Sequence, residues 1–196
     1  MTVERTTYWR TTGGEGDPEP VLQGEAEDAW AEEARQILTD VAGTYHRLID
    51  RTDLAAEVQE ASGVRTSKNP HYWLSRVLAQ VAAVNAVKDE PPLTALVVHR
   101  VNGTVGDDYD EVLRLTGADA ISDSNAREKH AAAARMECYR WAGATMPDGG
   151  GHPALSPRLD QRIVRERKRA REEAVPTVCP SCFMAVPATG VCDSCG

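Results

Sequence analysis

Apolar residues recur at three- and four-residue spacing along much of the chain, which indicates amphipathic helices. This pattern marks a first helix between residues 25 and 43 and a shorter one between residues 52 and 62. Thr52 can cap the shorter helix, and Gly63 suits a left-handed residue after its end. The pair Asn69-Pro70 predicts the start of a third helix, because Asn caps helices and Pro suits their first turn. The apolar stripe of this helix ends before Pro91.

The run Leu96-Val97-Val98 lacks helical spacing and lies between Pro91-Pro92 and Asn102-Gly103. A short apolar run bounded by turn residues indicates a buried strand, and Asn-Gly is the strongest local signal for a β-hairpin. We therefore predict a hairpin over residues 96–106, packed against helices. A short edge strand near residues 45–49 completes an element order that matches a winged helix.

Further helices are predicted downstream. Asn125 and Glu128 are spaced as a capping-box pair for a helix over residues 126–142, in which Cys138 is expected to be a core thiol. Residues 147–156 are rich in Gly and Pro and mark a linker. Ser156-Pro157 then begins a helix with seven cations over fourteen residues. Such a run is usually a solvated face, but it also suits phosphate binding.

Four cysteines form two close pairs near the C-terminal end: Cys179 with Cys182, and Cys192 with Cys195. Each C-x-x-C turn places two thiolates on one edge of a metal, and four sulfurs complete a tetrahedron around Zn²⁺. A segment this short cannot build a core, so the metal must supply most of its folding free energy. We predict one structural zinc per chain, with a small hairpin over residues 183–191 between the pairs.

These elements predict an α+β, mainly helical protein. Residues 1–24 are rich in Thr, Gly, Glu and Pro and are expected to form a disordered tail. A winged-helix-like domain over residues 25–146 follows, then a linker and basic helix over 147–174, and a zinc ribbon over 175–196. No apolar run reaches the roughly 18 residues that a membrane span needs, and the polar start lacks a secretory signal. We therefore expect a cytoplasmic protein.

The net charge of −8 is unevenly distributed. Residues 1–60 hold 5 basic and 14 acidic side chains, whereas residues 61–106 hold 5 basic and 2 acidic ones. The overall charge argues against a generally basic nucleic-acid binder. Residues 61–106, with a net charge of +3, are nevertheless compatible with a local contact to nucleic acid.

In a winged helix the second helix of the pair enters the major groove with its N-terminal residues forward. The residues expected to contact DNA lie at the start of the third helix, on the wing and on the basic helix. They are Lys68, Asn69, His71, Tyr72, Arg76, Arg100, Arg162, Arg165 and Arg169. Many winged helices bind protein instead, so the architecture alone fixes no function.

Four stretches together carry a family resemblance: Asn69-Pro70, residues 91–98, residues 102–109 and the terminal cysteine pairs. From about residue 45 to the end, the chain resembles the N-terminal module, with its zinc knuckle, of actinobacterial modification-dependent HNH restriction endonucleases. It also resembles stand-alone proteins of unknown role in actinobacteria and their phages. The chemistry of such enzymes resides in other domains, so the resemblance implies an accessory role. His152 lacks the paired histidine and asparagine that an HNH site requires.

The leading hypothesis is a non-enzymatic DNA-associated accessory module with double-stranded DNA as its partner. The alternative is a protein–protein interaction adaptor of phage or defence-system origin. The net charge of −8 favours the adaptor, and the basic block favours DNA. A nuclease ranks third, because no set of carboxylates or histidines converges on a metal-activated water. The oligomeric state is left open.

Overall fold

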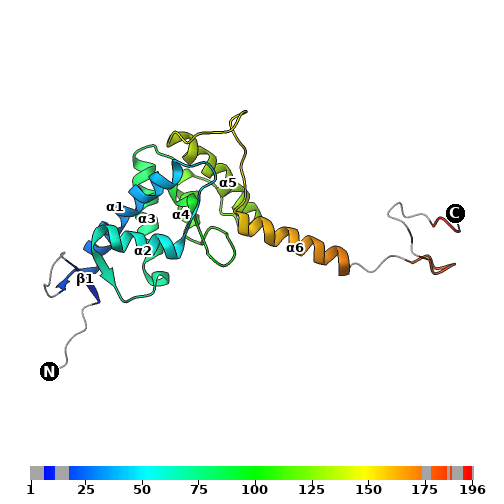
Figure 1. Cartoon of the computed structure of the whole chain (residues 1–196), viewed down its shortest axis with the longest axis horizontal. Helices are drawn as coiled ribbons and strands as arrows, with labels where there is room; N and C mark the ends of the chain where they lie inside the picture. The colour runs from blue at the N-terminus through cyan, green and yellow to red at the C-terminus, as the bar shows by residue number, and fades with distance from the viewer. Residues whose placement is uncertain (1–6, 12–17, 174–177, 185, 187–191, 196) are drawn as a thin grey trace, which may run out of the picture. The chain divides into compact units, whose positions relative to one another are not determined.

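A computed structural model describes residues 7–11, 18–173, 178–184, 186 and 192–195. The chain divides into two compact units, residues 1–159, which we call the body, and residues 160–196, the C-terminal unit. The described residues are mainly helical with short strands, as predicted (Figure 1). The α-helices are α1 (Gln23–Ala42), α2 (Arg51–Ser62), α3 (Leu74–Val87), α4 (Tyr109–Thr116), α5 (Ser124–Trp141) and α6 (Pro157–Glu173).

Two small sheets accompany these helices. Their strands are β1 (Tyr8–Arg10), β2 (Glu19–Pro20), β3 (Ile49–Asp50), β4 (Val64–Thr66) and β5 (Val97–Val98). β1 pairs antiparallel with both β2 and β4, and β3 pairs parallel with β5. Two 3₁₀ turns, η1 (Pro70–Tyr72) and η2 (Leu93–Leu96), precede α3 and β5. None of the described helices is both long enough and apolar enough to cross a membrane.

The disordered tail predicted for residues 1–24 is wrong for the described part of that segment. β1 is the central strand of its sheet, and the side chain of Tyr8 is buried against Trp30, with ring centroids 6.0 Å apart. Thr11 also donates its backbone N–H to the carbonyl oxygen of Gly63 at 3.0 Å. The composition suggested disorder because β4, one of the two strands that pair with β1, lies more than fifty residues further along the chain and gives no local signal.

The main core of the body lies between α1, α2 and α3. Trp30 and Trp73 are fully buried there with ring centroids 4.2 Å apart. The indole N–H of Trp30 donates to the carbonyl oxygen of Val64 at 2.9 Å, which satisfies its only polar atom. One side chain thus joins α1 to the sheet that holds β1.

The hairpin predicted over residues 96–106 does not form. β5 is two residues long and pairs with β3, not with a returning strand. His99 and Thr104 share a backbone hydrogen bond of 2.8 Å around Asn102-Gly103, so the tight turn is present. Beyond it, the backbone N–H of Val105 donates to the carboxylate of Glu128 instead of to a strand. The winged-helix interpretation therefore lacks its wing.

The residues at which the helices start were predicted to within a few positions. Several of the residues that cap them are not the predicted ones. Asp50, not Thr52, caps α2 by accepting from the backbone N–H groups of Thr52 and Asp53 at 2.9 and 3.0 Å. Gly63 ends α2 with φ of 68°, as predicted. Asn69 caps η1, and α3 begins only at Leu74.

The capping-box interpretation of Asn125 and Glu128 is also wrong. Asp123 caps α5, with its carboxylate 2.7 Å from the N–H of Ala126. Glu128 is 1% exposed and forms an ion pair with Arg135, which is 2% exposed. Arg135 also donates to the carbonyl oxygen of Ala95 at 2.7 Å, so the pair links α5 to η2.

The thiol of Cys138 is fully buried in α5, as predicted, and burial raises its pKa to about 12. A thiol with so high a pKa stays protonated at neutral pH, whereas nucleophilic cysteines need the thiolate. Cys138 is therefore a packing residue.

The predicted linker over residues 147–156 is attached to the body. Tyr45 donates its hydroxyl to the carbonyl oxygen of His152 at 3.1 Å and accepts from the N–H of His152 at 2.9 Å. Ser156 and Leu159 are buried. The boundary between the two units therefore falls inside α6, after Leu159, instead of in the linker.

Candidate metal centre

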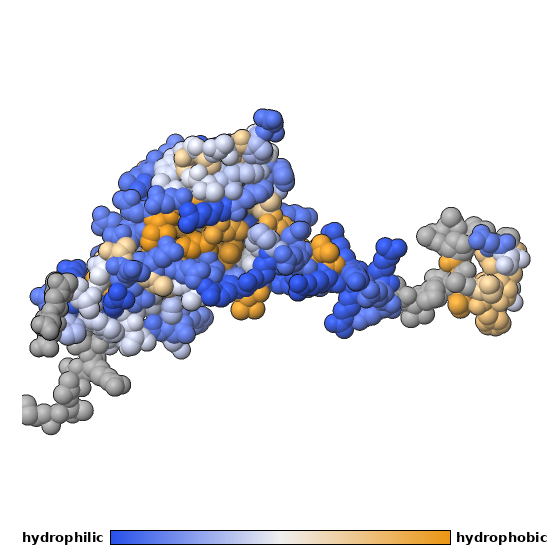
Figure 2. Space-filling view, viewed as in Figure 1, coloured by the Kyte–Doolittle hydropathy of each residue, from blue (hydrophilic) through white to orange (hydrophobic). Residues whose placement is uncertain are grey.

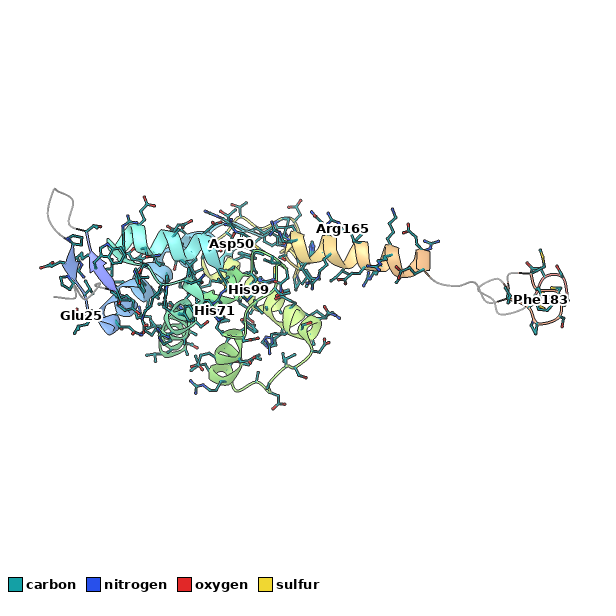
Figure 3. The ribbon with its side chains drawn as sticks, turned by 90° about the horizontal axis from the view of Figure 1, so that it is seen from below. Glu25, Asp50, His71, His99, Arg165 and Phe183 are labelled. Atoms are coloured by element: carbon teal, nitrogen blue, oxygen red, sulfur yellow. The ribbon has the colours of Figure 1, made fainter. Side chains whose placement is uncertain are left out.

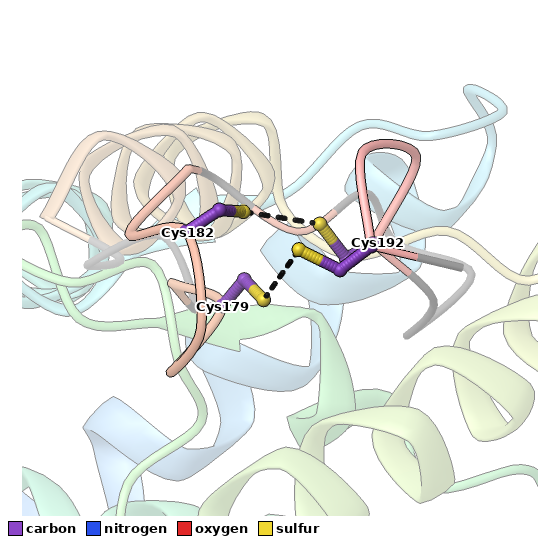
Figure 4. Close-up of side chains that lie close together, drawn as sticks. Cys179, Cys182 and Cys192 are labelled. Carbon is purple, nitrogen blue, oxygen red and sulfur yellow. Dashed lines mark hydrogen bonds between the residues drawn. The ribbon is translucent and has the colours of Figure 1, made fainter.

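The four paired cysteines lie together in the C-terminal unit. Their Sγ atoms are all within 4.8 Å of one another (Figure 4). Cys179 Sγ is 3.8 Å from Cys195 Sγ, and Cys182 Sγ is 3.5 Å from Cys192 Sγ. Each of these close contacts joins one C-x-x-C pair to the other, so the two turns face each other across a shared centre. Among the described residues this is the one group of three or more His, Cys, Asp or Glu side chains arranged to hold a metal ion.

These distances fit metal ligation and exclude a disulfide. Sulfurs bound tetrahedrally to Zn²⁺ at about 2.3 Å lie about 3.8 Å from one another, whereas bonded sulfurs lie only about 2.05 Å apart. Four cysteine ligands fill a tetrahedral shell and leave no open position for water or substrate. The group therefore suits a structural metal and not a catalytic one.

Local backbone geometry prepares two of the sulfurs for ligation. Hydrogen bonds from the backbone N–H groups of Cys182 and Ser181 lower the pKa of Cys179 to about 6. A backbone N–H from Ser194 likewise lowers the pKa of Cys192. Hydrogen bonds with the neighbouring sulfurs, of which the bond with Cys182 has the largest effect, raise the pKa of Cys195 to about 11. Without metal the thiol of Cys195 therefore keeps its proton at neutral pH, and metal binding must release that proton because the ligand is the thiolate.

The residue that follows the first pair has an unusual backbone. Phe183 has φ of +57°, in the left-handed region that costs an L-residue roughly 1–2 kcal/mol. Its backbone N–H donates to the carbonyl oxygen of Cys179 at 2.8 Å and closes the turn around the sulfurs. Phe183, labelled in Figure 3, is 79% exposed, and Met184, the next residue in sequence, is 59% exposed. Phe183 could not be singled out from the sequence, because φ is not visible in the residue type.

The hairpin predicted between the cysteine pairs falls largely outside the described residues, as do the ends of the predicted zinc ribbon. Of residues 183–191, the structure describes only 183, 184 and 186. We use the name knuckle for the described parts that surround the sulfurs, residues 178–184 and 192–195.

Two of the residues predicted to contact DNA near η1, Lys68 and Arg76, are held by side chains of other elements in the body. Lys68 donates to the hydroxyl of Tyr8 at 3.0 Å and lies 4.8 Å from the centre of its ring. Arg76 forms an ion pair with the buried Glu27 at 2.5 Å. Asn69 caps η1. The side chains of Tyr72 and of His71, which is labelled in Figure 3, are exposed. Replacing Lys68 or Arg76 would therefore remove a contact within the body.

The other predicted contacts also have acidic partners, with one exception. Arg100 pairs with Asp50 at 2.9 Å and with Asp53. On α6, Arg162 and Arg169 pair with glutamates four residues further on, at 3.6 and 2.7 Å. Arg165 forms no ion pair with another described residue. The predicted DNA residues thus lie in both units, with Lys68, Asn69, His71, Tyr72, Arg76 and Arg100 in the body and Arg162, Arg165 and Arg169 in the C-terminal unit.

No protein-family model, no curated protein and no solved structure matches this chain. The resemblance to the restriction-endonuclease module therefore stays a prediction.

Proposed function

We propose that the chain is a non-enzymatic, zinc-stabilised interaction module that contacts another protein through its knuckle. The tetrahedral spacing of the four sulfurs supports Zn²⁺ as the resident ion, because all-cysteine tetrahedral sites are characteristic of structural zinc. Zinc holds the knuckle, and the knuckle presents the exposed side chains of Phe183 and Met184. Large apolar side chains that remain exposed beside each other are a feature of protein contact sites.

The pairing of the predicted cations favours a protein partner over DNA. A cation already paired with a carboxylate must lose that partner before it can neutralise a phosphate, so it adds little to DNA affinity. Glu27 and Asp50 hold Arg76 and Arg100 in this way. The net charge of −8 also favours a protein partner, because a negatively charged chain is repelled by DNA phosphates.

A DNA-associated role remains the second candidate, supported by α6. Arg165, Arg167 and Arg171 are exposed and form no ion pair with another described residue. They offer a sequence-independent phosphate contact. A resident metal and a duplex contact are independent properties, so separate measurements test them.

Metal analysis tests the zinc assignment. The full chain, purified under reducing conditions without chelator, is expected to carry one zinc per chain by elemental analysis. Cys182→Ser should abolish it, whereas Cys138→Ala, which changes the one cysteine outside the knuckle, should retain it. A metal content near zero in the unaltered chain, or equal zinc in both variants, contradicts the assignment.

A salt-dependent titration with duplex DNA separates the two partner classes. The protein-partner proposal predicts no specific binding, and only a weak signal at low salt. If α6 does bind phosphates, the logarithm of the affinity should fall with a slope of about −0.9 per phosphate contacted. Replacing Arg165, Arg167 and Arg171 with Gln would then reduce that slope. Tight binding with this behaviour overturns the choice of a protein partner, and matched duplexes with methylated cytosine test the modification preference.

A further inference from the structure

A small pocket lies in the body where residues 154–157 meet α5. Its volume is about 50 Å³, which is room for about three to five water molecules. Its lining includes His46, Arg135, Tyr139, Ala154 and Pro157, and among the described residues that line it none is acidic. Figure 2 shows hydrophobic surface gathered on the body where α3 and its neighbours lie, whereas no described residue of α3 lines this pocket. The pocket is therefore separate from the apolar surface of the body.

The guanidinium of Arg135 brings an unused donor to this pocket. Arg135 is 2% exposed, and its Nε and Nη2 atoms donate to the carbonyl oxygen of Ala95 at 2.7 Å and to the carboxylate of Glu128 at 3.2 Å. Nη1 is also buried, but it has no hydrogen-bond partner among the described residues. Buried donors in native proteins are nearly always paired with a protein group or with a bound molecule. Nη1 therefore lacks an acceptor, and the pocket that Arg135 lines has room for one.

The imidazole of His46 can supply a second donor. Its Nε2 atom lies 3.3 Å from the carbonyl oxygen of His152, and because a carbonyl only accepts, Nε2 carries the proton in this contact. Nδ1 is left to take up a second proton and then to donate to a bound acceptor. The ring stacks on Tyr45 with centroids 3.8 Å apart and meets the edge of Tyr139 at 6.3 Å. These two aromatic contacts hold the imidazole at the pocket.

The charges around the pocket favour an anion over a water molecule. Glu128 balances the charge of Arg135, and protonated His46 then adds a positive charge that no acidic residue of the described lining offsets. The ring of His152 lies 5.6 Å from that of His46 and can add another. Pro157 is the first residue of α6, so the positive end of the helix dipole lies beside the pocket. A water molecule could pair with Nη1, but it would gain nothing from these positive groups.

We propose that this pocket binds a tetrahedral oxyanion of the phosphate or sulfate type. Oxygen atoms of the ion accept hydrogen bonds from Nη1 of Arg135 and from protonated His46. The lining comes from α5, from residues 46 and 48 and from residues 154–157, so a bound ion fastens the start of α6 to the rest of the body. The site uses the body alone and is independent of the zinc and of the partner contact proposed for the knuckle.

A titration followed by nuclear magnetic resonance tests this site. Isotope-labelled full chain receives sodium sulfate at pH 6, which favours charged histidines, with sodium chloride holding the ionic strength constant. The Nε–H resonance of Arg135 should shift and saturate, and inorganic phosphate should compete. His46→Asn should weaken sulfate binding by about tenfold or more, and Asn tolerates the φ of +63° at this position. Arg140→Gln is the control, because it removes an exposed cation of α5 that does not line the pocket.

Three results of this titration would overturn the proposal. If only water occupies the pocket, sulfate leaves the Arg135 resonance unchanged. If sulfate acts through general electrostatics, the response does not saturate. If Arg140→Gln weakens binding as much as His46→Asn does, the pocket is not the site of the ion.

A pocket-filling substitution tests the location without changing any charge. Ala154→Leu places apolar atoms at the pocket and should lower the sulfate affinity by about tenfold or more. Ala133→Leu makes the same change at an exposed position of α5 outside the pocket and should leave the affinity unchanged. Circular dichroism checks that both variants keep their helix content. Unchanged affinity in Ala154→Leu, or an equal loss in Ala133→Leu, means that the ion binds elsewhere and the proposal is wrong.

Discussion

The hydroxyl of Ser156 donates a hydrogen bond of 2.6 Å to the carbonyl oxygen of Gly103. The same hydroxyl oxygen accepts from the backbone N–H of Leu159 at 3.2 Å, so one side chain caps α6 and ties its first turn to the body. Gly103 has φ of +71°, and a Cβ added there would overlap Ser156 Oγ. The Asn102-Gly103 turn therefore contacts the start of α6 and does not lead into a returning strand.

Substitutions at this contact should separate backbone strain from steric overlap. Gly117 has φ of +69° and open space where a Cβ would lie, so Gly117→Ala carries only the left-handed backbone cost of roughly 1–2 kcal/mol. Gly103→Ala adds the clash with Ser156 and should lower the free energy of unfolding clearly more. Ser156→Ala should cost about 1–2 kcal/mol through the lost cap and the unpaired carbonyl. Urea unfolding measures all three, and equal losses for the two glycine variants would refute the contact.

Breaking the buried Glu128–Arg135 pair should be among the most damaging single changes in the body. Glu128→Gln leaves the Arg135 guanidinium without its counter-charge, a situation that typically costs about 3–5 kcal/mol. Glu111→Gln is the control, because its ion pair with Arg114 lies at the surface and should be worth at most about 1 kcal/mol. Replacing both buried partners with Leu and Met should recover part of the loss. Similar unfolding free energies for the two Gln variants would show that the buried pair contributes little.

The Glu27–Arg76 pair predicts a pH dependence of stability. Burial acts to raise the pKa of Glu27, but hydrogen bonds from Arg76 and Gln23 outweigh it and hold the pKa below its ordinary value of 4.5. A lowered folded-state pKa stabilises the protein above about pH 4.5, and this stabilisation is lost as the pH falls through the folded value.

Arg76→Met removes the charge and keeps the aliphatic stem. It should therefore be less stable than the unaltered chain at pH 7, and the difference should shrink below pH 4.5 as Glu27 becomes protonated in both proteins. Urea unfolding at pH 7 and near pH 3.5 measures this difference. A difference that stays constant with pH would mean that Arg76 stabilises the body through packing and not through Glu27.

The left-handed backbone at Phe183 predicts an unusual response to substitution. Phe183→Gly should relieve the backbone strain and raise the metal affinity, measured by competition with a chelator, by roughly fivefold for each kcal/mol relieved. Phe183→Ala also removes the ring but keeps an L-residue at the same φ, so its metal retention should match that of the unaltered chain. Equal retention by the Gly and Ala variants would show that the strain does not reach the metal site.

The features that could be predicted from sequence are those whose signals are local. The helical spacing, Gly63 after α2 and the two cysteine pairs each depend on residues within a few positions of one another. The misassigned features depend on distant partners. Tyr8 is ordered because β4 and Trp30 cover it, and composition alone cannot reveal that contact.

The same distinction applies to the candidate sites. Arg76 and Arg100 were expected to face DNA because their carboxylate partners lie about fifty positions earlier in the chain. Glu128 has the spacing of a cap, but its side chain turns inward to Arg135, seven residues further along α5. The groove between α1 and α3, lined by Ala31 and Val84 among others, was not predicted, because it requires the relative placement of two helices separated by α2.

The long sequence separation between β1 and β4 has a consequence for how the protein is made. β1 leaves the ribosome before β4, whose pairing residues follow 54 to 58 positions later. At about 5–20 residues per second, the strand waits roughly 3 to 12 seconds for its partner. Throughout that interval Tyr8 and the unpaired edge of β1 are open to other nascent chains. The acidic and Gly-rich residues around this strand would keep such encounters weak until α1 and α2 have been synthesised.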